Sequence, residues 1–228
     1  MTLEEYLAGV FDAKSRFFEK RGKFKITLNL RDADFLYWYY EKVSTGNFIK
    51  NKRTCAIVWN NDQICELQSL VPFLRLKDQK LKNVIDFLNA DFDIFTRRAI
   101  LHDVRRTLHS DLEFSSSPPF SYVAGFFDVC MSIAFVKYKP RINVIYSKKH
   151  VLEKFREILQ AGSVYRLSKT FNLTFYHEVE VFNLVQILYP EIHCKKEYFS
   201  ILYDLFADLI SVDDARAAIR RLNRHSTV

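Results

Sequence analysis

The sequence contains few of the residues that interrupt regular structure. Only five of its 228 residues are glycine and five are proline, whereas 49% are hydrophobic and 15% are aromatic. This composition supports a substantial buried core and excludes a disordered or low-complexity chain. No apolar run approaches the roughly 18 residues that a membrane-spanning helix needs. No signal or transit peptide is recognisable, so we expect a cytoplasmic or organelle-encoded product that does not enter a membrane.

Cysteine and histidine are sparse and scattered. The cysteines, with no CxxC pair among them, are Cys55, Cys65, Cys130 and Cys194. The six histidines show no metal-ligand spacing on a helix. A disulfide framework and a zinc site are therefore excluded, and we expect neither a metal nor another cofactor.

Charge is the first positive indication of function. The formal net charge is +7 and the isoelectric point is about 9.1. A basic chain favours polyanionic partners, with nucleic acid ahead of an anionic membrane surface. An ordinary basic soluble protein remains an equally good reading of the charge alone.

The chain repeats itself. Three segments recur in the same order, the first two at an offset of 116 residues and the third at 118. They are 6–12 with 122–128, 41–47 with 157–163, and 72–77 with 190–195. Such ordered self-similarity indicates a duplicated unit of about a hundred residues.

The repeats set the expected domain boundaries. The first repeat spans residues 1–95 and the second spans 119–210. Residues 96–118 form a basic connector that begins as a helix with Arg97 and Arg98 and ends in the breaker 115–119. Residues 211–228 form a basic C-terminal helix or tail.

Hydrophobic periodicity switches in the same order in both repeats. In the first we expect helices at 2–13, 34–43 (ending at Gly46), 62–73 and 78–88, and strands at 15–21, 23–30, 47–52 and 54–59. In the second we expect helices at 120–129, 150–159, 178–188 and 197–210, and strands at 132–139, 141–147, 163–168 and 171–177. The pattern αββαββα, twice, predicts an α+β fold whose antiparallel sheets are covered by helices on one face.

These features resemble the LAGLIDADG homing-endonuclease family over nearly the whole chain. The signature helices read LAGVFDAKS from Leu7 to Ser15 and VAGFFDVCM from Val123 to Met131, and a late element reads FLRLKDQK from Phe73 to Lys80. The resemblance implies a monomer with two pseudo-symmetric repeats, whose sheets form a nucleic-acid-binding saddle. It also implies that the signature helices pack closely through small and helix-end residues. Those residues are Ala8, Gly9, Asp12, Ala124, Gly125 and Asp128.

Cationic and amide side chains on the open sheet faces suit contacts with phosphates and base edges. In the first repeat we expect binding by Lys23, Lys25, Thr27, Asn29, Lys50, Lys52 and Arg53. In the second we expect binding by Lys137, Lys139, Arg141, Asn143 and Arg166. The late-element lysines, Lys77 and Lys195, are assigned to phosphate contact. Solvation of an ordinary sheet face is the competing interpretation.

The sequence departs from the family where cleavage would occur. Active members carry an acid at the eighth signature position of each helix, and the two acids hold divalent metal at the scissile phosphates. Lys14 and Cys130 stand there instead. An ammonium repels a cation, and a thiol is a poor ligand for Mg²⁺. Asp12 and Asp128 lie two residues earlier, about 200° around the helix, so we do not expect them to replace the missing ligands.

The resulting hypothesis is a catalytically inactive, LAGLIDADG-derived nucleic-acid-binding protein. RNA is favoured over DNA because family members have become intron-splicing maturases, so ribosomal RNA, a ribonucleoprotein such as the ribosome, or an intron is the expected partner. Four tyrosines could stack on unpaired bases or simply pack: Tyr138, Tyr146, Tyr165 and Tyr176. The alternatives are a DNA-binding protein, a nuclease with unorthodox ligands, and a protein scaffold. A regulator would need an added helix-turn-helix, for which the residues after Ile210 are too few.

Overall fold

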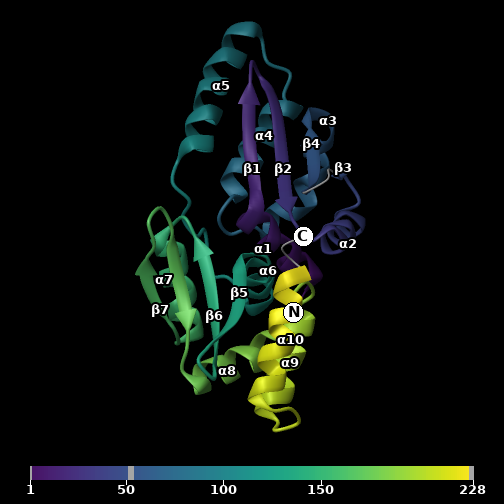
Figure 1. The fold of residues 1–228 in the computed structure, drawn as a ribbon. Helices are drawn as coiled ribbons and strands as arrows, with labels where there is room; N and C mark the ends of the chain where they lie inside the picture. The colour runs from purple at the N-terminus through teal and green to yellow at the C-terminus, as the bar shows by residue number, and fades with distance from the viewer. Residues whose placement is uncertain (1, 51–53, 226–228) are drawn as a thin grey trace. The chain divides into compact units, whose positions relative to one another are not determined.

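The chain folds into two compact units, each with one four-stranded sheet. The structure is a computed structural model that describes residues 2–50 and 54–225. Unit 1 is Met1–Tyr122 and unit 2 is Val123–Val228. Strand order is β1-β2-β4-β3 in unit 1 and β5-β6-β8-β7 in unit 2, and all pairs are antiparallel (Figure 1). The predicted α+β fold of two repeats with antiparallel sheets is therefore confirmed.

Unit 1 follows the expected order of elements. In chain order they are α1 (Leu3–Lys14), β1 (Ser15–Lys20), β2 (Lys23–Leu30), α2 (Ala33–Val43), β3 (Asn47–Lys50), β4 (Cys55–Asn60), α3 (Asn61–Ile64), the 3-10 helix η1 (Cys65–Phe73), α4 (Asp78–Asn89) and α5 (Ile94–His109). The helix expected at 62–73 is mostly a 3-10 helix and contains Pro72. Proline has no amide hydrogen and disfavours an α conformation at the residue before it, which favours the end of the helix at Phe73.

Unit 2 repeats this order. Its elements are α6 (Phe120–Cys130), which begins in the last residues of unit 1, β5 (Met131–Val136), β6 (Lys139–Tyr146), α7 (Lys149–Leu159), β7 (Ser163–Arg166), β8 (Phe171–Phe175), α8 (Glu178–Leu188), α9 (Lys196–Phe206) and α10 (Val212–His225). Strands β2 and β6 correspond residue by residue at the offset of 116 found in the sequence. No helix in the described part of the chain has the length and apolarity to cross a membrane.

Helices cover one face of each sheet because the strands alternate. In β2, Phe24, Ile26 and Leu28 are buried. Phe24 contacts Phe87 of α4, with ring centroids 5.4 Å apart. In unit 2, Phe127 of α6 lies 5.3 Å from Phe155 of α7. The side chains between these buried positions therefore form an open face in each unit.

One glycine allows a close approach that any side chain would block. Helix α2 ends at Val43, and its C-cap is Ser44, whose φ is 57°, and not the expected Gly46. Gly46 has a φ of +100°, and a Cβ there would lie 2.7 Å from Nε1 of Trp59. That indole nitrogen donates a 3.0 Å hydrogen bond to the carbonyl of Thr45. The positive φ of Gly46 thus seats the chain against the buried tryptophan.

The last helix of each unit is part of its unit. In unit 1 the Lys80 ammonium donates to the carbonyls of Leu108 (3.0 Å) and Ser110 (2.8 Å) at the end of α5. In unit 2 the Asn223 amide of α10 donates to the carbonyl of Ile133 in β5, at 3.1 Å. The helix expected in the connector, α5, and the helix expected in the tail, α10, are therefore each bonded to their own unit.

Candidate nucleic-acid interface

The open face of the unit 1 sheet carries the side chains expected from β2. Lys23, Lys25 and Asn29 are exposed, whereas Thr27 on the same face is only 8% exposed. The Asn29 amide donates to the Thr27 hydroxyl at 3.3 Å. This face therefore presents two ammonium groups and an amide to solvent.

Neighbouring strands add cations that the sequence analysis did not single out. The register places Arg16 opposite Thr27 and Lys20 opposite Lys23, so both share the open face. Arg16 and Lys20 are exposed. The alternation of residues 15–20 alone does not tell which side chains of β1 lie on the open face. That assignment also requires the register between β1 and β2, which the turn determines.

Two predicted contacts lie on the other face. Lys50 pairs with Cys55, which is opposite Leu30, so it follows the helix-covered side at the end of β3. Arg166 occupies the same position in unit 2, opposite Phe171. Both are exposed because they end their strands, and the nucleic-acid contact expected of them remains a prediction. Lys52 and Arg53 lie outside the described residues.

The open face of the unit 2 sheet carries Lys139, Arg141 and Asn143 from β6. They alternate with the buried residues Pro140, Ile142 and Val144. The turn before β6 holds Lys137, with a φ of 58°, and Tyr138, which is 66% exposed. Of the cations predicted in β6, Lys139 is therefore exposed to solvent and Arg141 is half-buried.

Four polar side chains form a hydrogen-bonded group on the unit 2 open face, termed here the polar cluster: Asn143, Tyr165, Asn172 and Thr174. The Asn172 amide nitrogen lies 2.6 Å from the Tyr165 hydroxyl and 2.9 Å from the Thr174 hydroxyl. The Thr174 hydroxyl donates to Oδ1 of Asn143 at 2.9 Å. Asn172 is 4% exposed, and among the described residues its Oδ1 has no hydrogen-bond partner. The cluster therefore retains an unused buried acceptor.

The matching positions in unit 1 are almost all apolar. At the offset of 116 residues they are Thr27, Ile49, Ala56 and Val58. The strand pairing is the same, since Ile49 pairs with Ala56 as Tyr165 pairs with Asn172. The two open faces thus share a backbone but differ in hydrogen-bonding capacity.

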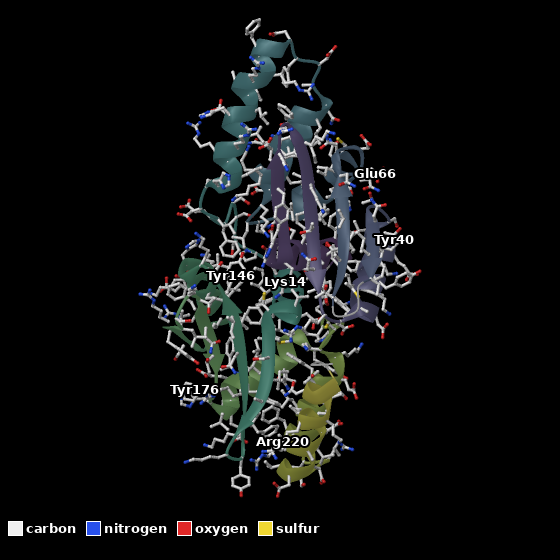
Figure 2. The ribbon with its side chains drawn as sticks, turned by 45° about the horizontal axis from the view of Figure 1, so that its top comes forward. Lys14, Tyr40, Glu66, Tyr146, Tyr176 and Arg220 are labelled. Atoms are coloured by element: carbon white, nitrogen blue, oxygen red, sulfur yellow. The ribbon has the colours of Figure 1, made fainter. Side chains whose placement is uncertain are left out.

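Two lysines lie at the end of the first signature helix, α1. Lys14 is half-buried in the last turn of α1, where α1 joins β1 (Figure 2). Lys77 is 6% exposed, and its Nζ lies 2.6 Å from the carbonyl of Asp12 and 2.8 Å from that of Ser15. Helix-end carbonyls lack partners within the helix and attract cations. The phosphate contact expected of Lys77 therefore differs from the structure, which places the ammonium inside unit 1.

Asp12 binds the late element instead of facing solvent. Its Oδ2 accepts hydrogen bonds from the backbone N–H of Arg75 (2.8 Å) and Leu76 (2.9 Å) and from the Tyr122 hydroxyl (2.7 Å). The carboxyl is fully buried, and this burial raises its pKa above the ordinary value of 3.8, although the charge of Lys77 and the hydrogen bonds act in the opposite direction. The carboxylate is thus engaged in anchoring the chain near residue 75.

The second signature helix has the same anchor with a different lysine. Asp128 accepts hydrogen bonds from the backbone N–H of His193 (2.7 Å), Cys194 (2.7 Å) and Lys195 (2.6 Å). The Lys195 ammonium, however, lies 4.8 Å from the centroid of the Tyr198 ring and is half-buried. The phosphate contact predicted for Lys195 remains a prediction.

The remaining signature residues are buried or half-buried. Ala8 and Ala124 have no exposed surface, and Gly9 and Gly125 are buried. Cys130 is half-buried as the last residue of α6. Within residues 2–50 and 54–225, no three histidine, cysteine or acidic side chains gather as metal ligands would.

Comparison of sequences finds no match, whereas comparison of structures finds proteins with a similar fold. Neither a family model nor a curated protein matches the chain. The homing endonuclease I-GzeII, solved in complex with its DNA target, superposes with a TM-score of 0.74 and 14% identity, covering 96% of this chain and 97% of that one.

Two further solved structures agree. I-SmaMI, bound to an uncleaved DNA target in the presence of calcium ions, gives a TM-score of 0.66 at 11% identity and covers 98% of this chain and 99% of its own. The meganuclease I-AabMI, bound to uncleaved DNA, gives 0.64 at 13% identity, with coverage of 96% and 97%. The chain therefore has the fold of the LAGLIDADG homing endonucleases.

Proposed function

We propose that this chain binds nucleic acid through the open faces of its two sheets and does not hydrolyse it. The observation that carries the proposal is the pair of residues at the signature helix ends, Lys14 and Cys130, where cleavage would need acids. The cationic and amide side chains of β2 and β6 support the binding, since such groups contact phosphates and base edges. Solved DNA complexes with the same fold also support it.

A divalent metal ion does not fit the donors at these helix ends. Mg²⁺ requires hard oxygen ligands in octahedral geometry, and Lys14 and Cys130 supply an ammonium and a soft thiol group. In unit 1 the Lys77 ammonium already binds the carbonyls of Asp12 and Ser15. These carbonyl oxygens at the helix end are therefore already occupied, and a bound cation repels a second one. No hydrolytic step therefore follows from these residues.

We further propose that the natural partner is RNA, such as ribosomal RNA or an intron. Exposed aromatic side chains support this choice because unpaired bases are recognised by stacking. Phe18 is 50% exposed on the unit 1 open face, and Tyr165 is 42% exposed on the unit 2 open face. Tyr138 and Tyr176 are exposed too, and Tyr176 stands at the edge of unit 2 in Figure 2. Tyr146 instead packs edge-on against Phe126, at 4.9 Å.

Duplex DNA is the second candidate, favoured by a specific observation. Three of the solved structures with this fold, those of I-GzeII, I-SmaMI and I-AabMI, are DNA complexes. The open faces also present cations in rows along β2 and β6, which suits a phosphate backbone. A DNA partner would leave the proposed lack of hydrolysis unchanged.

The test begins with crosslinking and sequencing of nucleic acid bound to the full chain in its native host. We expect one class of RNA; a defined DNA site would support the second candidate. The recovered molecule is then incubated with the chain and Mg²⁺ or Mn²⁺. Metal-dependent product would refute the proposed lack of cleavage, and salt-insensitive or absent binding to both polymers would refute the binding itself.

A pair of lysine variants locates the binding face. Lys25→Gln removes a charge from the open face of β2, whereas Lys82→Gln removes one from an exposed position on α4. A phosphate contact contributes roughly 0.9 to the slope of log affinity against log salt. We expect Lys25→Gln to lower the slope by about that amount and Lys82→Gln to leave it unchanged.

A further inference from the structure

The β1–β2 hairpin ends in three exposed cations and a glycine, residues 20–23, termed here the hairpin tip: Lys20, Arg21, Gly22 and Lys23. Arg21 and Gly22 form the turn with φ angles of 56° and 76°. All three charged side chains are exposed, and Lys20 pairs directly with Lys23. Three neighbouring cations on a turn form a surface suited to phosphates.

One carboxylate lies at the base of this tip. Glu19 directly precedes Lys20, and its Oε1 accepts a 2.6 Å hydrogen bond from the backbone N–H of Gly22. The acid therefore helps to close the turn. Left unpaired, its negative charge would attract the adjacent ammonium groups and repel an approaching phosphate.

Helix α5 supplies the countercharge. Arg105 donates two hydrogen bonds to the Glu19 carboxylate, from Nε to Oε2 at 2.7 Å and from Nη2 to Oε1 at 2.9 Å. The Glu19 side chain is 10% exposed, and the hydrogen bond from Arg105 holds the pKa of this carboxyl below its ordinary value. Helix α5 runs beside the hairpin (Figure 1), so a residue 86 positions away along the chain neutralises the only acid of residues 15–23.

We infer that Arg105 is a positioning residue that keeps the hairpin tip a phosphate-binding surface by neutralising Glu19, without touching nucleic acid. The inference rests on the proposed nucleic-acid binding. It adds the hairpin tip and α5 to the interface and gives the segment between the repeats a role in recognition. The ligand chemistry is the phosphodiester backbone, which both DNA and RNA present.

The corresponding hairpin of unit 2 offers an internal contrast. Its tip contains Lys137, Tyr138 and Lys139 and has no acid to neutralise. Arg216 of helix α10 also lies near this tip. Its guanidinium carbon is 5.9 Å from the centroid of the Tyr138 ring, so its partner there is an aromatic ring and not an acid. An arginine there acts by packing on an aromatic face. Charge compensation is therefore specific to the tip of unit 1.

Charge-matched variants test the inference in the full chain. The probes are a labelled mixed-sequence DNA duplex and an RNA hairpin with the same stem sequence. Arg105→Gln exposes the Glu19 charge, so we expect affinity for both probes to fall roughly tenfold and the salt slope to drop by about 1–2. Glu19→Gln/Arg105→Gln removes both charges, and we expect affinity to return to within about twofold of the original chain.

The double variant separates the two possible roles of Arg105. If it binds as weakly as Arg105→Gln, the arginine itself contacts the nucleic acid and the inference is wrong. Arg106→Gln, which removes a neighbouring charge that forms an exposed ion pair with Asp103 at 3.4 Å, controls for net charge and should change affinity by less than about twofold. Thermal unfolding of each variant confirms that it is folded.

The controls also distinguish this inference from the function on which it rests. If the original chain binds neither probe in a salt-dependent manner, the proposed function fails. If the original chain binds and Arg105→Gln binds equally well, only the role of the hairpin tip is refuted.

Discussion

Replacement of the buried Lys77 should unfold unit 1 at a much lower denaturant concentration. Lys77→Met keeps most of the side-chain volume but removes an ammonium that is bonded to the carbonyls of Asp12 (2.6 Å) and Ser15 (2.8 Å). It also leaves the fully buried carboxyl of Asp12 without its nearest cation. Removing one partner of a buried charged group costs about 3–5 kcal/mol. We expect the free energy of unfolding of unit 1 to fall by that amount.

Lys195→Met is the matched control. Its ammonium contacts the face of the Tyr198 ring, at 4.8 Å, and it is half-buried. A cation–π contact near the surface is worth about 1 kcal/mol or less. The difference between the two variants, roughly 2–4 kcal/mol, therefore measures what burial at the helix end contributes.

Urea unfolding can follow unit 1 alone. Both tryptophans of the chain, Trp38 and Trp59, lie in unit 1, so their fluorescence reports that unit, and far-ultraviolet circular dichroism reports both. A loss below about 1 kcal/mol for Lys77→Met, the ordinary effect of a surface substitution, would refute the argument that this ammonium holds the end of α1.

The same contact predicts a pH dependence. Burial already raises the pKa of Asp12 above 3.8, so the folded state holds this proton more tightly than the unfolded chain does. Protonation of Asp12 therefore stabilises the folded state. This stabilisation is fully present when the pH is below the ordinary pKa of 3.8 and is lost as the pH rises through the raised pKa of the folded state. Removing Lys77 raises that pKa further. The gap between Lys77→Met and the original chain should therefore narrow on acidification, as urea midpoints across pH will measure.

Three other outcomes are expected. Gly46→Ala should destabilise unit 1 by roughly 2–4 kcal/mol, because the new Cβ would lie 2.7 Å from the Trp59 indole at a φ of +100°; tryptophan fluorescence in urea measures this loss. Glu19→Gln should flatten the acid limb of unit 1 stability, since a lowered pKa stabilises the fold above its ordinary 4.5 and this contribution disappears as pH falls through the folded value; urea midpoints between neutral and acid pH measure it. Asn172→Ala/Thr174→Val gives unit 2 the residues of the matching unit 1 positions and removes a buried unpartnered acceptor; stability should change by about 1 kcal/mol or less, while selection from a randomised nucleic-acid pool should lose sequence preference.

Much of the fold was accessible from the sequence because the repeat and the strand periodicity are local signals. The alternation of Lys23 to Leu30 predicted both the bounds of β2 and its buried side. In the second repeat the corresponding strand was expected at 141–147, whereas β6 begins two residues earlier, at Lys139, because the turn lies at residues 137 and 138. The C-cap of α2 was placed at Gly46, whereas the helix ends at Val43 and its C-cap is Ser44. Here tertiary contact with Trp59, and not helix termination, determines where glycine is needed.

The candidate site was less accessible because its side chains depend on partners distant in sequence. A lysine such as Lys77 is a residue type that often contacts phosphates. Its burial at the end of α1, however, follows from the hydrogen bonds that join the late element to Asp12. The polar cluster joins three strands, and Asn172 has no local pattern that marks it. The Glu19–Arg105 pair links a hairpin to a helix 86 residues later. Such pairings become visible only in three dimensions.

The two units show how a shared backbone can carry different chemistry. Their strands match at a constant offset because buried alternation constrains the register, and both signature aspartates anchor a late element in the same way. Side chains that are neither part of the buried alternation nor signature aspartates differ between the units. At the helix ends, Lys77 binds a carbonyl at the end of α1, whereas the Lys195 ammonium lies over the Tyr198 ring. An acid introduced at residue 14 would therefore still share its helix end with a buried ammonium. Under the proposed function, Lys77 as well as Lys14 disfavours a divalent metal ion at the end of α1.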